Sequence, residues 1–319
     1  MEEGIIMKYF AKKLTGLVIT LLAVSFLVFA AFAVIPGDPA TAMLGTEATP
    51  ERVEALREEL GLTAPIFVRY IRWAADFVRG DFGTSYRYNM PVKDMIWEKV
   101  PVTLTLTAMS FCMIVLISIP LGLSCARHAG GRLDRSVIVI DQVIMAVPAF
   151  FSGILITLVF GLILHLFIPG DYVSYKTNPS RFLGYMIFPS VAIALPKAAM
   201  AVKLLRTSVL AQMKLDYVRT AYSRGNTTRK VLYRHVLKNA MIPVATFLGM
   251  ALADMVAGSI VIEQVFNIPG MGRILLTSIS NRDYPVVEAI IVCIAFLVII
   301  INFLVDLIYR AIDPRITLE

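Results

Sequence analysis

Long apolar runs, separated by shorter polar segments, form the dominant pattern of this sequence. A helix needs about 20 apolar residues to cross a bilayer core of roughly 30 Å. Six runs are long enough: residues 10–34, 102–125, 137–168, 182–205, 242–262 and 286–308. The third run is overlong and contains Pro148, so we expect it to kink or to protrude from the membrane. The pattern predicts an all-α, polytopic membrane protein with six transmembrane helices.

One longer polar segment, residues 36–101, follows the first apolar run. Its stretch ATPERVEALREELG predicts a helix, because Thr49 can cap it, Pro50 fits the first turn and Gly61 can end it. The following stretch, PIFVRYIRWAADFVRGDFG, has apolar residues at helical spacing. Roughly 65 residues give little core. We therefore favour a small helical cap on the outer membrane face over a ligand-binding domain.

Composition and charge support a membrane protein and orient it. A mean hydropathy of +0.75 with 17% charged residues excludes an ordinary soluble two-domain protein. Residues 203–238 carry nine Lys or Arg and the single acid Asp216, whereas the predicted outer loops 170–181 and 263–285 carry two Lys or Arg each. Because Lys and Arg are retained on the cytoplasmic side, both termini are expected inside the cell. The first apolar run is too long for a cleaved signal peptide and is interpreted as a retained anchor.

The basic loop, residues 206–239, has features that topology alone does not require. Gly225 divides two helix-compatible stretches, 214–224 and 227–239, and can supply a left-handed turn. Leu215, Val218 and Tyr222 are spaced to form an apolar strip on one helical face. A loop that only sets topology and touches anionic lipid would explain the charge but not this strip. An exposed apolar strip indicates a surface that another protein covers. The chain lacks the soluble fold of a nucleic-acid-binding protein, and we expect no nucleic-acid partner.

The same loop carries a family resemblance. The stretch RTAYSRG at 219–225, with MIP following at 241–243, resembles the signature loop of ABC importer permeases. Arg219 and Thr220 replace the Glu-Ala of the general pattern, as is usual in the peptide branch. Further blocks are IPGDPA (35–40), GDFGTSY (80–86), QVFNIPGMGR (264–273) and DPRI (313–316). The chain resembles the dipeptide, oligopeptide and nickel permease family, first subunit type, over nearly its whole length.

This resemblance implies a type I ABC importer permease fold with the following segments: a cytoplasmic tail (1–9), a first span (10–34), an extracytoplasmic helical cap (35–101), a core with five spans (102–310) and a second cytoplasmic tail (311–319). It also places the family's usual start at Met7, so that residues 1–6 are a tail or follow from an upstream start codon. The location implied is the inner membrane of a prokaryote.

The resemblance further implies a set of partners and a coupling site. The partners are the lipid bilayer, a second permease subunit, two cytoplasmic ATP-binding subunits and an extracytoplasmic substrate-binding protein. The short helix after the fourth span would dock on the ATPase, through Arg219, Thr220, Ala221, Tyr222, Arg224 and Gly225. The sequence contains no GxxxxGK[ST] loop that could hold ATP phosphates. ATP and Mg²⁺ are therefore expected on the partner ATPases, with no cofactor and no catalysis in this chain.

Ionisable residues within apolar runs are candidates for the translocation pathway, because an unpaired charge in a membrane is costly. Lys197, Asp254 and Glu288 are such residues, and Asp306 is expected to be structural. Lys197 can instead snorkel to the cytoplasm, and Asp254 can form a buried pair with it. Two acids near a cavity would suit a cationic cargo or a peptide amino terminus.

The cargo alternatives are short peptides and, second, nickel or a metal chelate. An ion-coupled secondary transporter is a more distant alternative. The three histidines and three cysteines are scattered along the sequence without a ligand motif, so no metal site is expected in the chain itself.

Overall fold

The computed structural model describes residues 2–34, 39–44, 48–59 and 61–312. The C-terminal block 313–316, residues 35–38 of the IPGDPA block and the side chain of Asp306 lie outside that description. The chain divides into two compact units, Met1–Val102 with Pro269–Phe303, and Thr103–Ile268 with Leu304–Glu319. The described part is almost entirely helical, and its only β pairing is an isolated bridge between Thr84 and Pro91.

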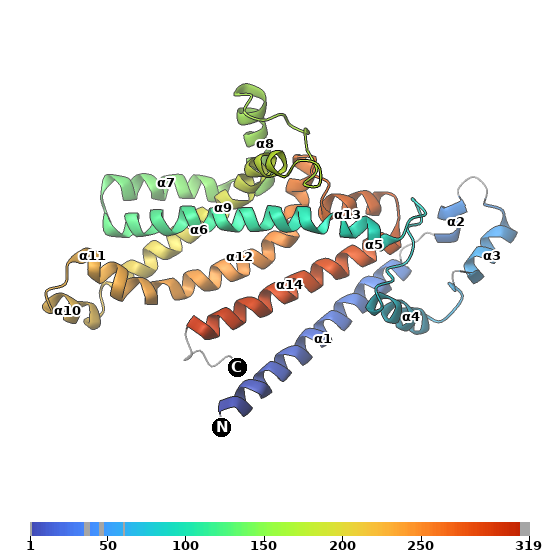
Figure 1. Cartoon of the computed structure of the whole chain (residues 1–319), viewed down its shortest axis with the longest axis horizontal. Helices are drawn as coiled ribbons and strands as arrows, with labels where there is room; N and C mark the ends of the chain where they lie inside the picture. Colours follow the sequence, from blue (N-terminus) through green and yellow to red (C-terminus); the bar gives the residue numbers. More distant parts are fainter. Residues whose placement is uncertain (1, 35–38, 45–47, 60, 313–319) are drawn as a thin grey trace. The chain divides into compact units, whose positions relative to one another are not determined.

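The first unit combines the N-terminal helices with a late pair of helices (Figure 1). Its elements are α1 (Glu2–Val34), α2 (Pro39–Leu44), α3 (Pro50–Glu59), α4 (Ile66–Val78), α5 (Val92–Trp97), α13 (Met271–Ser280) and most of α14 (Tyr284–Ile312). The predicted α3 is confirmed: the backbone N–H of Arg52 lies 3.4 Å from the Thr49 hydroxyl, and Gly61 adopts φ 65°. Left-handed φ is accessible to glycine without a steric penalty, so the helix ends there.

Aromatic packing holds α4 against α1. The Tyr70 ring meets the Phe26 ring edge-on at 5.2 Å, and the Trp73 ring lies 5.7 Å from the Phe29 ring. The hydroxyls of Ser25 and Tyr70 are 2.8 Å apart, which gives a polar contact inside this apolar contact area. Such aromatic pairs contribute about 0.5–1.5 kcal/mol each beyond the area they bury.

A buried carboxylate fixes the loop that follows α4. Asp283, in the turn between α13 and α14, accepts hydrogen bonds from the Ser85 hydroxyl at 2.5 Å and from the Tyr86 backbone N–H at 2.9 Å. Asp283 is fully buried, so both bonds are made out of contact with water. Losing either donor would leave a buried charge short of partners, which is costly. The contact therefore joins two segments almost 200 residues apart in the sequence.

The second unit is organised around α9. Its elements are α6 (Val100–Arg127, from Thr103), α7 (Arg132–Ala146), α8 (Ala149–Ile156), a π-helical segment (Thr157–Ile163), α9 (Pro179–Gln212), α10 (Asp216–Ser223), α11 (Thr228–Val231), a second π-helical segment (Leu232–Val236) and α12 (Leu237–Val265). α9 packs against α7, α8 and α12, and α8 also packs against α12. Small buried residues along α9, such as Ala194, Ala198 and Ala201, allow this close packing.

The predicted kink at Pro148 is confirmed. α7 and the segment from α8 to Ile163 meet at an angle of 102°. Val147 has an extended backbone (φ −91°, ψ 122°), because the ring of a following proline disfavours the helical region. Counted as one broken span, this pair joins five other apolar helices: Leu14–Phe32, Val92–Arg127, Pro179–Gln212, Thr228–Val265 and Tyr284–Val305. The described chain thus has the six spans that the sequence predicts.

The sequence does not predict the burial of Glu263, at the end of α12. Its carboxylate is completely buried and accepts hydrogen bonds from the Thr103 hydroxyl at 2.6 Å and, more weakly, from the Ser259 hydroxyl at 3.4 Å. Glu263 falls in a predicted outer loop, where an acid needs no partner. α12 continues to Val265, beyond the expected end at residue 262, so Glu263 lies within the helix and inside the fold. Its hydrogen bond with Thr103 joins the end of α12 to the start of α6.

A close approach of α6 and α9 gives a stability prediction. A Cβ atom at Gly122 would lie 3.0 Å from Cβ and Cδ2 of Leu205, whereas a Cβ at Gly184 would meet no atom within 4 Å. We expect Gly122→Val to destabilise the protein by about 1–3 kcal/mol through overpacking. The matched Gly184→Val should change stability little. Thermal unfolding of both variants in detergent checks this, and equal melting temperatures would contradict the packing described.

Candidate functional site

The predicted helix–turn–helix in the basic loop is present. α10 begins at Asp216, whose negative charge suits a helix N-terminus. It ends at a turn in which Gly225 has φ 74° and donates its N–H to the Tyr222 carbonyl at 2.8 Å. The Asn226 side-chain amide donates to the Ala221 carbonyl at 2.8 Å, so the carbonyls at the end of α10 have partners. Thr227 then caps α11.

The apolar strip expected on α10 is not a single face. Leu215 precedes the helix in an extended conformation (φ −80°, ψ 153°), so helical spacing does not apply to it. Val218 and Ala221, three residues apart, form the inner face and are only 1% and 4% exposed. α10 packs against α11 and the π-helical segment after it. The prediction that Val218 lies on the docking face is wrong, because this chain buries it. Ala221, a predicted coupling residue, is also buried and lies on the inner face of α10.

The outer face of α10 presents the other predicted coupling residues. Arg219, Thr220, Tyr222 and Arg224 are exposed, and Tyr222 keeps 39% of its surface free. Arg219 pairs with Asp216 at 3.2 Å, but both side chains are solvent-exposed, so this pair contributes little to stability.

A basic hollow continues this surface along α11. It has a volume of about 590 Å³ and is lined by Thr227, Arg229, Lys230, Tyr233 and Arg234. Tyr233 is exposed within it. An exposed tyrosine among arginines has the composition of a protein interface, where aromatic residues and Arg are enriched. We call α10, α11 and the π-helical segment that follows them (residues 216–236) the coupling segment.

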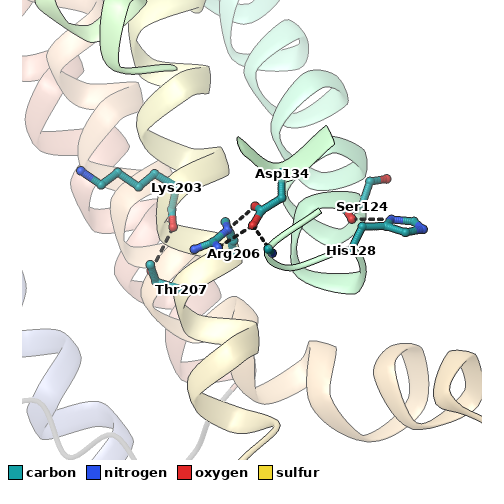
Figure 2. A network of polar contacts seen from close by, with 7 residues as sticks. Ser124, His128, Asp134, Lys203, Arg206 and Thr207 are labelled. Carbon is teal, nitrogen blue, oxygen red and sulfur yellow. Dashed lines mark hydrogen bonds and ion pairs between the residues drawn. The ribbon is translucent and has the colours of Figure 1, made fainter. Parts of the chain in front are cut away.

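A buried ion pair lies on the helix that leads into the coupling segment. Arg206, two turns before the end of α9, donates from Nε and Nη2 to the two carboxylate oxygens of Asp134 at 2.5 and 2.7 Å (Figure 2). Asp134 also accepts the Gly130 backbone N–H at 2.8 Å and is 1% exposed. Lys203, one turn earlier on α9, points away from this carboxylate (Figure 2). The bidentate contact fixes the start of α7 to α9. The sequence does not predict this pair, because its two partners come from two different predicted inner loops.

Of the predicted pathway residues, the structure brings two together. The Lys197 ammonium on α9 pairs with the Asp254 carboxylate on α12. The pair was expected to be buried if it formed, but 68% of the Asp254 side chain is exposed. Glu288 belongs to the first unit and lines a hollow there with Arg69.

Metal-ligating side chains are scattered in the described residues. No group of three or more His, Cys, Asp or Glu in that part of the chain could hold a metal ion. Cys112, Cys125 and Cys293 are free thiols. His128 contacts the Ser124 carbonyl through Nδ1 at 2.9 Å and so belongs to the turn before α7 (Figure 2).

The chain is similar to several proteins of known class. It is 33% identical to the probable peptide ABC transporter permease y4tP of Sinorhizobium fredii, covering 97% of this chain and 98% of that protein. It is 33% identical to the oligopeptide transport system permease AppB of Bacillus subtilis (93% and 95%). It is 35% identical to the glutathione transport system permease GsiC of Salmonella paratyphi A (97% and 99%).

Its fold is similar to that of a chain in the inward-facing MetNI methionine ABC transporter. The TM-score is 0.56 at 20% identity, over 69% of this chain and 98% of that one. This likeness confirms the expected fold of a type I ABC importer permease.

Two family models match the sequence. One, described as the binding-protein-dependent transport system inner membrane component, matches residues 118–318, and one for the N-terminal part of such membrane components matches residues 6–107. The first model alone covers more than half of the chain. With its apolar spans, the chain therefore belongs to the family of binding-protein-dependent transport system inner membrane components, and it is a multi-pass permease subunit.

Proposed function

We propose that this chain is the permease subunit of an ATP-driven importer for short peptides. The observation that carries the proposal is similarity over almost the full length to permeases named for peptides, oligopeptides and glutathione. The six apolar spans supply half of a translocation pathway, and a second permease subunit supplies the other half. A substrate-binding protein outside the membrane delivers the peptide. Both chain termini and the coupling segment face the cytoplasm, in accord with the Lys and Arg excess of that segment.

The coupling segment is the proposed docking surface for an ATPase. Tyr222 and Arg219 form its exposed face, while Val218 and Ala221 anchor that face to the rest of the chain. Gly225 sets the direction in which the chain turns back towards the membrane. ATP and Mg²⁺ are bound by the ATPase partners, and this chain receives their motion mechanically. Two such subunits closing on ATP would displace α10 and shift the permease between two states.

The coupling segment is connected to transport helices at both of its ends. Residues 213–215 join α10 to α9, and the π-helical segment Leu232–Val236 runs directly into α12. α9 and α12 form the most extensive helix contact in the second unit. A push on α10 therefore acts on two packed helices at once. Lys197 lies on α9 and Asp254 on α12, so a change in the distance between these helices would alter the ion pair.

Peptides are preferred over nickel or a metal chelate for a physical reason as well. Asp254 is paired with Lys197, which neutralises the carboxylate that a metal cation would need. A zwitterionic peptide can exchange partners with both members of this pair. An ion-coupled secondary transporter would need no ATPase and therefore no docking surface for one. The exposed surface of α10 thus favours an ATP-driven transporter over this alternative.

The docking proposal predicts the effect of truncating Tyr222. Removing an interface aromatic costs about 1–3 kcal/mol of binding, so Tyr222→Ala should weaken ATPase association by a factor of about 5 to 150. Arg219→Glu should weaken it as well. Tyr88→Ala provides a matched control, because Tyr88 is an exposed tyrosine in the first unit. Co-purification of the ATPase with each variant measures the effect. ATPase retention equal to wild type in both α10 variants would remove α10 as the docking element.

A pathway role for the Lys197–Asp254 pair predicts a transport defect without a stability defect. On this proposal the pair faces a water-filled pathway rather than lipid, so losing the Asp254 charge should alter the melting temperature little. Asp254→Asn should lower peptide uptake by the assembled transporter, because Lys197 is left without its partner. Uptake of labelled dipeptides and the melting temperature are measured on the same preparation. Normal uptake of every dipeptide tested would take Asp254 out of the pathway.

A further inference from the structure

The first unit contains a hollow that the proposed coupling mechanism does not use. It has a volume of about 410 Å³ and lies between α1, α4, the loop after α4 and the start of α14. That volume is in the range of small-molecule binding sites, which run from about 300 to 1,000 Å³. All residues that line it belong to the first unit. Charged side chains and aromatic rings face the same space.

Glu288 is the deepest charged group in this hollow. It is 9% exposed, and within the described part of the chain it forms no hydrogen bond or ion pair. Burying a carboxylate without a partner costs several kcal/mol, so such groups are usually found paired. Asp76, the other acid in the hollow, pairs with Arg79 at 3.4 Å. Glu288 is thus the acid in the hollow that lacks a counter-charge in contact.

Two arginines from α4 provide the opposite charge in the same hollow. Arg69 and Arg72, three residues apart, lie on one face of the helix. The Arg69 guanidinium sits 5.7 Å from the centre of the Phe29 ring. Arg69, Tyr86 and Glu288 line the same hollow. Burial raises the pKa of Tyr86 to about 12; the Glu288 charge raises this pKa further and the Arg69 charge lowers it. Positive and negative groups therefore share one small space.

The remaining wall is aromatic. Phe29, Trp73, Tyr86 and Tyr284 contribute rings to the hollow. Aromatic faces attract ammonium groups and also accept apolar side chains. A metal ion needs several oxygen ligands together, and one free carboxylate flanked by arginines does not supply them. A ligand with one ammonium, one carboxylate and small apolar groups matches every part of this lining.

We propose that this hollow binds a short zwitterionic peptide, with its ammonium group at Glu288 and its carboxylate at Arg69 and Arg72. The inference rests on the proposed function as a peptide permease and adds a binding site to it. Because the site lies on α4 and the ends of α1 and α14, it would hold a peptide on the side from which the binding protein delivers it. The site selects for free peptide termini rather than for particular side chains.

Tryptophan fluorescence can report binding at this site. Of its two tryptophans, Trp73 lines the hollow and Trp97 does not. Full-length protein carrying Trp97→Phe, in lipid nanodiscs without its partners, is titrated with L-alanyl-L-alanine while Trp73 emission is recorded. The expected result is a saturable change in emission. N-acetyl-alanyl-alanine and alanyl-alanine amide, which each lack one charge, should bind at least about tenfold more weakly.

Glu288→Gln tests the ammonium contact, with Glu51→Gln as the matched control. Both changes replace a carboxylate by an amide of the same shape, but Glu51 is exposed on α3. Glu288→Gln should weaken dipeptide binding about tenfold or more, and Glu51→Gln should leave it unchanged. Equal binding by the dipeptide and its N-acetyl form in the Trp97→Phe protein overturns the inference even if Glu288→Gln fails to fold.

Uptake by the complete reconstituted transporter separates this inference from the proposed function. Dipeptide uptake without any Trp73 response would overturn the site and leave the peptide importer standing. A saturable Trp73 response without dipeptide uptake would support the site and overturn the importer. Both readouts present, with both reduced by Glu288→Gln, would support the two together.

Discussion

The ion pair between Asp134 and Arg206 is the contact on which the architecture of the second unit depends. α7 exposes apolar side chains on its outer surface and packs against α9 on its inner side. The pair fixes the start of α7, because the almost fully buried Asp134 carboxylate accepts hydrogen bonds from Arg206 and from the Gly130 N–H. Removing one member of such a pair costs about 3–5 kcal/mol, because the other charge stays buried. The position of α7 is therefore tied to that of α9.

The position of Arg206 on α9 connects the ion pair to the proposed function. Arg206 lies six residues before the helix ends at Gln212, and the coupling segment follows at once. Motion imposed on α10 by an ATPase would reach α9 first, and the ion pair would carry it to α7. α12 would receive the same motion through the π-helical segment Leu232–Val236, which runs directly into it. Small buried residues on α9 allow α7 and α12 to pack closely against it.

The sequence predicted those features that arise from local chemistry. The spans, the kink at Pro148, the ends of α3 and the turn at Gly225 each follow from an apolar run, a proline or a glycine. Long-range placement of charges was not predictable in this way. Glu263 and Asp134 each lie in or next to a predicted loop, and their partners are distant in the sequence. The face of α10 was misassigned because the helix begins one residue after Leu215, which leaves Val218 and Ala221 to pack inward. Glu288 was recognised as unusual, but its neighbours Arg69 and Arg72 come from another segment.

The central claim is that the Asp134–Arg206 pair transmits motion of the coupling segment from α9 to α7. Asp134→Asn tests it directly, because the amide oxygen can still accept the Gly130 N–H while the charge that holds Arg206 is lost. The measurement is the number of peptides imported per ATP hydrolysed by the complete transporter in liposomes. The account predicts that the variant still binds its ATPases but imports fewer peptides for each ATP. An assembled variant with an unchanged ratio would contradict it.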